Sequence, residues 1–229
     1  ILILTFVVIV IGSAALFVVL SAFAGLKTFS LQFTNTFDPD LKVTPATGKF
    51  FALTPDQSER LDKLEGLAFY AKELEERVYL GHKDKNAIAF IKGIDSNYRR
   101  VTGLDSTLYY GQWNSNRQEV VVGRGIANAL GLSIGSFQKP LNIITLKGGK
   151  GSLTADGLNA KNFYKQFNGI VTGVYSIEEQ LDKSYIFAEL ATVRNFLEKS
   201  PDEISALNIK LSDPEAEAEI RNAVTTILG

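Results

Sequence analysis

The amino-acid sequence predicts an α+β protein in which an N-terminal transmembrane helix precedes a mixed α/β domain. Residues 1–26 contain no charged residue, whereas every charged residue of the chain lies after them. Segments with the alternation of β-strands and segments with helical spacing then follow one another without a strict β-α-β order, which favours a mixed sheet. We therefore expect a membrane helix at 1–26 and a soluble domain at 27–229.

The N-terminal run ILILTFVVIVIGSAALFVVLSAFAGL is long enough to cross a lipid bilayer. As a helix it would extend about 39 Å, which exceeds the ~30 Å thickness of the hydrocarbon core. One alternative is a secretory signal peptide cleaved after Ala24, but the apolar part of such a peptide covers roughly 7 to 15 residues after a basic start. A second alternative is a buried core helix, which is rarely apolar on every face.

The composition argues against several classes of function. The 24 basic and 25 acidic residues give a net charge of -1, so we expect no binding to nucleic acid. The chain contains no cysteine, which excludes thiolate nucleophiles and thiolate metal sites. Its single histidine, His82, has no ligand partner at metal spacing, and we interpret it, with Glu76 and Asp84 nearby, as part of a solvated turn. Methionine is also absent, so we expect the chain to be part of a longer polypeptide.

Two short strands, a helix and a hairpin are predicted after the membrane helix. Residues 38–53 have the pattern of two strands joined by a Pro/Gly turn. Thr54–Gln57 is a capping box with proline at the first helical position, and the helix it begins should end at Gly66. Residues 67–80 and 86–94 form a predicted hairpin around the turn GHKDK. One face of this hairpin should carry Val78, Leu80, Ile88, Phe90 and Lys92.

The stretch EVVVGRGIANALGLSIG, residues 119–135, predicts a buried strand, Glu119–Val122, and a helix, Arg124–Leu130, that ends at Gly131. A strand that runs into glycines and a helix also begins dinucleotide sites, but Asn128 stands where that fingerprint needs its third glycine. The same stretch contains the G-x-S-x-G pattern of serine hydrolases. Here the pattern follows the helix instead of preceding it, and no histidine comes after it. We therefore interpret this stretch as structural.

No other motif supplies the chemistry of an active site. The run GGKGS, residues 148–152, lacks the first glycine and the magnesium-binding Ser or Thr of a Walker loop. The pairs Glu75-Glu76 and Glu178-Glu179 are adjacent in sequence and would point apart on a strand. The aromatic residues of YYGQW, residues 109–113, are interpreted as core rather than as a ligand-stacking site. We predict no catalytic residue, no cofactor and no metal ligand.

The last third of the chain adds strands, helices and one long insert. Residues 141–146 and 167–175 have the pattern of strands, and a polar, glycine-bearing insert lies between them. A helix is predicted next, with Phe187, Leu190, Val193 and Leu197 at helical spacing. It is followed by a capping box at Ser200–Glu203 and a strand at 206–211. A final helix should begin at Asp213-Pro214 and carry Ala216, Ile220, Val224 and Ile227 on one face.

Five segments follow one another in a characteristic order: LSAFAGLKTF, FDPDLKV, AFIKGID, EVVVGRGIANALGLSIG and GIVTGVYSIEEQLDKSYIFAELATVRNFL. Their order resembles the first membrane span and extracytoplasmic domain of FtsX/MacB-type ABC transporter permeases. The similarity is greatest to the LolC/LolE lipoprotein-releasing permeases, and it covers essentially all 229 residues. Gly123 and Gly125 would, on this resemblance, let a core strand turn tightly into a packed helix.

The resemblance implies a non-catalytic permease subunit of the bacterial inner membrane, with a periplasmic domain of the MacB type. It also implies a separate cytoplasmic ABC ATPase subunit, a second permease copy or homologue, and a mechanism in which ATP-driven movement of the spans is passed to the periplasmic domains to release lipoproteins. Two other functions stay open: a MacB-like exporter or FtsX-like regulator of cell-wall hydrolases, and a membrane-anchored binding domain unrelated to transport.

The insert Gly148–Asn162 is the predicted partner-binding segment. In the LolC branch, the resemblance places a β-hairpin hook here that recruits a periplasmic lipoprotein carrier, although this insert contains no proline. Leu153 and Leu158 are its only large apolar residues, and at a hairpin tip they would dock on an apolar groove. Lys150 and Lys161 would steer the insert toward an acidic carrier. The alternative is a flexible surface loop.

Overall fold

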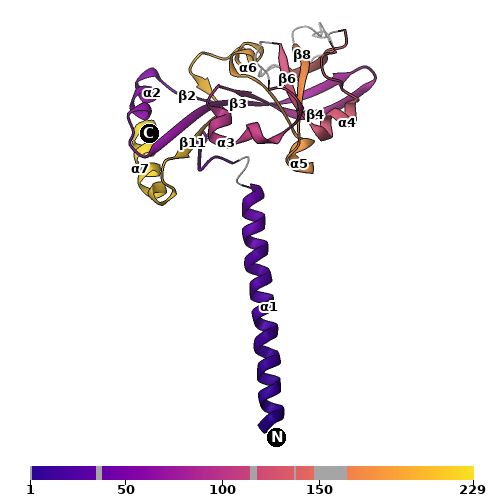
Figure 1. Ribbon diagram of the computed structural model, residues 1–229. Helices are drawn as coiled ribbons and strands as arrows, with labels where there is room; N and C mark the ends of the chain where they lie inside the picture. Colours follow the sequence, from indigo (N-terminus) through magenta and orange to yellow (C-terminus); the bar gives the residue numbers. More distant parts are fainter. Residues whose placement is uncertain (1, 35–37, 114–117, 137, 147–163) are drawn as a thin grey trace. The chain divides into compact units, whose positions relative to one another are not determined.

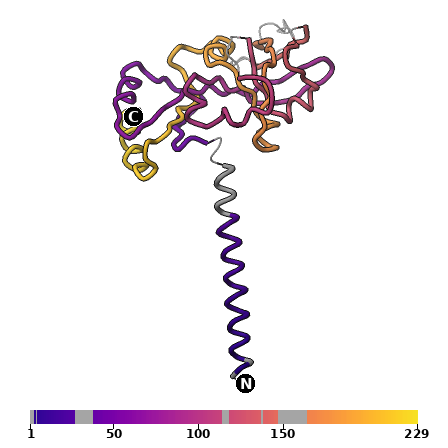
Figure 2. The backbone as a smooth tube through the Cα atoms, viewed as in Figure 1, coloured from indigo at the N-terminus to yellow at the C-terminus, as the bar shows by residue number. Residues whose placement is uncertain are grey.

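A long apolar helix precedes a mixed α/β domain in the computed structural model (Figures 1 and 2). The helix, α1 (Leu2–Thr34), belongs to one compact unit, Ile1–Asp38, and the domain forms a second, Pro39–Gly229. Among the described residues, α1 is the one helix long and apolar enough to cross a membrane, over Thr5–Leu26, and none of that window is buried. The structure describes residues 2–34, 38–113, 118–136, 138–146 and 164–229.

The domain is built on a mixed sheet, as the sequence predicts. Its strand order is β1-β11-β3-β4-β9-β6-β8-β5, and β7 pairs with both β3 and β8. The pairs β4–β9 and β6–β8 are parallel, and the others are antiparallel. The strands are β1 (Leu41–Val43), β3 (Leu67–His82), β4 (Lys85–Ile94), β5 (Leu108–Gly111), β6 (Glu119–Gly123), β7 (Leu141–Leu146), β8 (Tyr164–Tyr175), β9 (Tyr185–Glu189) and β11 (Ala206–Leu211). A small second sheet pairs β2 (Phe51–Ala52) with β10 (Glu203–Ile204).

The double pairing of β7 closes six strands into a ring, in the order β3, β4, β9, β6, β8, β7 and back to β3. Apolar side chains from all six strands meet in one core, together with residues of α4 (Arg124–Leu130) and α6 (Leu190–Leu197). A smaller core lies at the other end of β3, between β11, α2 (Pro55–Asp62) and α7 (Glu217–Leu228). Figure 1 shows β3 crossing the domain between these two ends. The domain therefore has two cores that share one long strand.

The capping box predicted before α2 is confirmed. The Thr54 hydroxyl accepts a hydrogen bond from the Gln57 N–H at 3.2 Å, and the Gln57 side chain accepts one from the Thr54 N–H at 3.0 Å. This reciprocal pair satisfies two backbone donors that an eight-residue helix could not satisfy internally. The helix ends at Asp62, one turn earlier than the glycine at position 66 had indicated.

We expect Thr54→Ala to lower the free energy of unfolding by about 1 kcal/mol, because it removes the hydroxyl acceptor of this cap. Thermal or urea unfolding of the chain measures the loss. Thr54→Ser is the matched control, since it keeps the hydroxyl and should stay close to the parent protein. Equal losses in both variants would contradict a role for the cap.

The β3–β4 hairpin corrects one prediction about its faces. The connection is a two-residue turn at Lys83 and Asp84, so His82 lies opposite Lys85 and Val78 lies opposite Ala89. Val78 and Leu80 are buried, with Ala89, on the inner face of the ring. Ile88 lies opposite Tyr79 on the outer face, with Phe90 and Lys92 on that same side. The sequence prediction put both sets on one face and is wrong, because side chains alternate across a sheet and the turn fixes which residues pair.

Two helix signals in the last third of the chain are overridden by strand pairing. Tyr185–Glu189 is the buried strand β9 between β4 and β6, so the predicted helix begins only at Leu190. In the Ser200–Glu203 box, the Glu203 carboxylate does accept a hydrogen bond from the Ser200 N–H at 2.9 Å. The chain then enters β10 instead of a helix. Both predictions fail because a local pattern cannot report a partner strand that is distant in the sequence.

The segment Gly93-Ile94-Asp95, one of the motifs that carry the resemblance, has a packing role. A Cβ atom at Gly93 would lie 2.6 Å from the Cβ of Val193, so a side chain here would collide with α6. The Asp95 carboxylate accepts hydrogen bonds from the N–H groups of Lys72, Asn97 and Tyr98 at 2.7, 3.0 and 3.0 Å. It thereby fixes the turn from β4 into α3 (Tyr98–Thr102).

Candidate functional site

The predicted partner-binding segment begins and ends on a rigid pair of strands. β7 and β8 pair antiparallel over six residues, from Leu141 opposite Gly169 to Leu146 opposite Tyr164. The two strands predicted on either side of the insert are thus neighbours in the sheet. Four residues were predicted to contact a partner, and all lie outside the described residues: Lys150, Leu153, Leu158 and Lys161.

A fork in the sheet lies beside the foot of these strands. On the side away from β4, β3 pairs with β11 up to Glu73 and with β7 from Tyr79 onward. Between these points the edge of β3 is closed by side chains. The Ser205 Oγ accepts from the Glu75 N–H at 2.8 Å, and the Thr145 hydroxyl donates to the Arg77 carbonyl at 3.2 Å. Side-chain closure leaves an opening where a further strand would otherwise lie.

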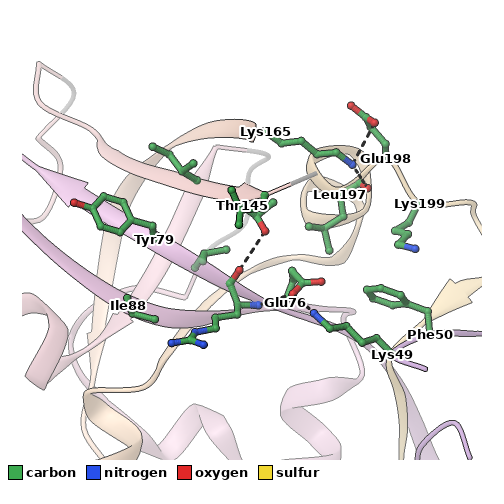
Figure 3. Close-up of a pocket in the computed structure, with 14 residues that line it drawn as sticks. Lys49, Phe50, Glu76, Tyr79, Ile88, Thr145, Lys165, Leu197, Glu198 and Lys199 are labelled. Carbon is green, nitrogen blue, oxygen red and sulfur yellow. Dashed lines mark hydrogen bonds and ion pairs between the residues drawn. The ribbon is translucent and has the colours of Figure 1, made fainter. Parts of the chain in front are cut away.

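The fork contains a groove of about 850 Å³ (Figure 3). Residues of β3, β4, β7 and β8, the end of α6, and Lys49 and Phe50 just before β2 line it. Figure 3 shows Lys165 directed toward Leu197 and Glu198. The Lys165 ammonium donates a hydrogen bond to the Leu197 carbonyl and forms an ion pair with Glu198 at 3.2 Å. On the other side, Lys49 pairs with Glu76 at 2.6 Å. The groove therefore has apolar walls and a charged rim.

A row of apolar side chains on the outer face of the ring lines part of this groove. Ile88, Tyr79 and Ile144 lie opposite one another on β4, β3 and β7. Ile88 is 57% exposed and Tyr79 is 44% exposed, while Leu146, at the end of β7, is 81% exposed. Contiguous exposed apolar surface next to a groove is typical of a protein or peptide contact site. The sequence prediction missed this surface because it placed Ile88 on the same face of the hairpin as Val78 and Leu80.

A second feature is a buried cluster of charges where the two cores meet. The Glu73 carboxylate, 1% exposed, lies 3.1 Å from the Lys92 ammonium and 3.1 Å from the Lys42 ammonium. Its second oxygen accepts a hydrogen bond from the Asn208 amide at 3.0 Å. Lys92 is 3.2 Å from Glu75 as well. One signal of this cluster is visible in the sequence: charged residues interrupt the otherwise alternating strands β3 and β4.

The neighbouring cations keep Glu73 ionised. Burial alone would raise the pKa of this carboxyl, but Lys92 and Lys42, with hydrogen bonds from Lys42 and Asn208, outweigh burial and lower its pKa to about 2. Burial likewise opposes the charge on Lys92, and its neighbours, which include Glu73 and Glu75, raise its pKa instead. Glu73 and Lys92 therefore both stay charged at neutral pH, as members of a structural ion network.

The histidine and the aromatic residues considered in the sequence as candidate site residues can now be placed in the structure. His82 is only 5% exposed, so its interpretation as part of a solvated turn is wrong. Trp113 packs edge-on against Phe187 at 5.8 Å, in agreement with a core role, whereas Tyr109 and Tyr110 are exposed. Within the part of the chain that the structure describes, no group of three His, Cys, Asp or Glu side chains could hold a metal ion.

The fold defines a class of protein first: a mixed α/β domain that follows an apolar helix of membrane-spanning length. Comparison with known families then identifies the particular one. The chain belongs to the MacB-like periplasmic core domain family, which matches residues 2–227. The resemblance to FtsX/MacB-type permeases that the sequence motifs indicated is thereby confirmed.

Individual relatives agree with this family. The transmembrane protein LolE of the lipoprotein-releasing system of Haemophilus influenzae is 27% identical over 139 residues, which is 57% of this chain and 30% of LolE. The chain thus spans less than a third of the length of that relative. The periplasmic region of MacB from Actinobacillus actinomycetemcomitans superposes with a TM-score of 0.53 and 17% identity, covering 77% of this chain and 72% of the other. The extracellular domain of the ABC-type transporter YknZ from Gram-positive bacteria gives 0.50 and 13%, covering 78% and 80%. These two likenesses establish the fold.

Proposed function

We propose that this chain is part of the permease subunit of an ABC transporter that couples cytoplasmic ATP hydrolysis to the extraction and release of lipoproteins from the bacterial inner membrane. The observation that carries the proposal is the match of nearly the whole chain to the MacB-like periplasmic core domain family, combined with the similarity to LolE over 57% of the chain. The apolar helix α1 would anchor the subunit, and the α/β domain would stand in the periplasm.

In this proposal, ATP hydrolysis and contact with the substrate are carried out by different subunits. A separate cytoplasmic ABC ATPase hydrolyses ATP, and a second permease copy or homologue completes the membrane part. The present chain needs no cofactor and no catalytic residue, because its task is to hold and release a substrate. The described surface supports contact with a substrate, since the groove beside β7 and the exposed Leu146 offer apolar contact area.

The insert between β7 and β8 is proposed to recruit a soluble lipoprotein carrier in the periplasm. Lys150 and Lys161 would attract an acidic carrier surface, and Leu153 and Leu158 would supply the apolar contact. What supports this is the position of the insert, since it leaves the ring directly beside the groove and the exposed end of β7.

A MacB-like exporter or an FtsX-like regulator of cell-wall hydrolases is the second candidate function. The likeness of the fold to the periplasmic region of MacB favours it, because that likeness extends over 77% of the chain. The two candidates differ in what leaves the membrane. A lipoprotein-releasing permease transfers an acylated protein to a soluble carrier, whereas the alternatives leave acylated proteins in place.

Reconstitution of the full-length permease with its ATPase subunit in proteoliposomes tests the proposal. Lipoproteins loaded in the bilayer should appear in the soluble fraction only when ATP and a carrier are present. Replacing residues 149–161 by an Asn-Gly turn should reduce transfer roughly tenfold or more, because the contacting side chains are lost. The six-residue pairing of β7 with β8 should keep the domain folded.

A Gly/Ser segment of the same length in place of residues 149–161 is the matched control for this variant. It keeps the reach of the insert and removes its leucines and lysines, so it should fail to transfer as well. Transfer at the parent rate by the shortened variant would exclude the insert as the carrier contact. Absence of any ATP-dependent release by the parent protein would instead refute the proposed function.

A further inference from the structure

Strand β1 is held to the domain by one short strand pairing and by its side chains. β1 is the first strand after α1 in the chain, and it pairs over three residues with a single neighbour, β11. A three-residue edge strand gains little from its backbone hydrogen bonds alone, because such short pairing is marginal in water. Side chains must therefore contribute to keeping β1 in place.

Two side chains of this segment make ionic contacts with the domain. The Asp40 carboxylate accepts hydrogen bonds from the Lys210 ammonium and the Leu211 N–H, both at 2.8 Å. These partners lie on β11, so this contact only repeats the backbone pairing. Lys42 reaches past β11 instead, and its ammonium lies 3.1 Å from the buried Glu73 carboxylate on β3.

Glu73 passes the contact on to the ring of strands. The Glu73 oxygen that meets Lys42 also lies 3.1 Å from Lys92 on β4, and Lys92 in turn meets Glu75 at 3.2 Å and the Tyr185 ring of β9 at 4.8 Å. Asn208 of β11 binds the second Glu73 oxygen at 3.0 Å. One carboxylate thus joins β1 and β11, which border the smaller core, to β4 of the ring, whose interior is the larger core.

We propose that the Glu73 carboxylate is a coupling latch: Lys42 locks β1 onto it, Lys92 ties it to the ring, and a displacement entering β1 from the membrane helix is passed through it to the strands beside the groove. Only the last step rests on the proposed function, since the lock itself is a property of the domain. Lys42 is the removable member of the latch. Its side chain is 38% exposed, whereas those of Glu73 and Lys92 are 1% and 4% exposed. If Lys42 withdraws, Glu73 and Lys92 still neutralise each other, and the ring stays intact.

The variant Lys42→Met tests the latch, because it keeps the apolar stem of the side chain and removes the ammonium. Hydrogen exchange of the full-length permease, reconstituted with its ATPase subunit, should become roughly tenfold faster in the peptide that covers residues 39–44. Exchange in residues 85–94 should not change, because Lys92 keeps its partners. ATP-driven release of lipoprotein should fall severalfold while ATP hydrolysis continues.

Lys210→Met is the matched control, because it removes a lysine from the strand next to β1 and leaves Glu73 untouched. Its partner Asp40 keeps the hydrogen bond from the Leu211 N–H, and the Lys210–Asp40 pair is more exposed, with side chains 44% and 26% exposed. We expect its exchange rates to stay within about twofold of the parent protein. Unchanged exchange at residues 39–44 in Lys42→Met would overturn the lock, and normal release despite faster exchange would overturn the coupling. If the parent protein releases no lipoprotein, the proposed function fails, and the exchange data still decide whether the lock exists.

Discussion

Gly123→Ala is expected to destabilise the domain by more than about 3 kcal/mol, a large effect for one added methyl group. The backbone of Gly123 has an ordinary φ of -67°, so its conformation does not require glycine. Its surroundings do, because a Cβ atom there would lie 2.1 Å from the Asp182 carbonyl oxygen and 2.7 Å from the Asp182 Cα. Backbone atoms cannot rotate away as a side chain can. Fluorescence of Trp113, the single tryptophan, during urea unfolding measures the loss.

Gly81→Ala is the matched control for this substitution. Gly81 is also in a strand, and its new Cβ would meet its nearest neighbours only at 3.9 Å, which is ordinary contact. We expect the change in unfolding free energy to stay within about 0.5 kcal/mol. Comparable losses in the two variants would show that glycine itself, rather than the contact with Asp182, sets the stability at position 123.

Glu73→Gln is the second variant with a large expected effect, a loss of about 3 to 5 kcal/mol at neutral pH. The substitution leaves Lys92 buried, at 4% exposure, with Glu75 as its remaining carboxylate among the described residues. It also removes the charge that Lys42 and the Asn208 amide meet. Glu59→Gln is the control, because the Glu59–Lys63 pair is exposed and should contribute less than about 1 kcal/mol.

The same carboxylate predicts how stability depends on pH. The groups that interact with it are Lys42, Lys92, Asn208 and Tyr98, and Glu75 shares its partner Lys92. Because folding lowers the pKa of Glu73 from 4.5 to about 2, its contribution is complete above pH 4.5 and is lost as the pH falls from there toward 2. That loss is about 3 kcal/mol. The gap in unfolding free energy between the parent protein and Glu73→Gln should therefore narrow below pH 4.5. A gap that is constant from pH 7 to pH 3 would contradict the predicted titration.

Local patterns in the sequence predicted most of the fold because they record short-range physics. The strand Glu119–Val122, the helix Arg124–Leu130 and its end at Gly131 all follow from residues that are neighbours in the chain. Gly131 has a φ of 65°, which glycine adopts at low cost. Pairings between distant segments left no such record. Tyr185–Glu189 is a strand because it pairs with β4 and β6, and this pairing cannot be predicted from the residues of Tyr185–Glu189 alone.

The candidate site was predictable only in part, for a similar reason. The foot of the insert could be placed because strands on either side of a polar, glycine-bearing connection are expected to pair. The groove could not, since it exists where β11 and β7 meet the same edge of β3 without meeting each other. Two segments that carry the family resemblance also contact each other, because Gly123 in one leaves room for the backbone of Asp182 in the other. Gly123 was expected to permit a tight turn, whereas in the structure it permits close packing against Asp182.

The closed ring of six strands also affects how readily this domain aggregates at high concentration. An open sheet presents unpaired backbone groups along its edge strands, and such edges template aggregation between molecules. Among the described strands of the large sheet, the outer edges are left to β1 and β5, which are three and four residues long. Edges this short offer few hydrogen bonds to a second molecule. The ring should therefore tolerate inserts of different length and composition between β7 and β8 without exposing a sticky edge, so that the partner-facing segment can vary while the protein stays dispersed.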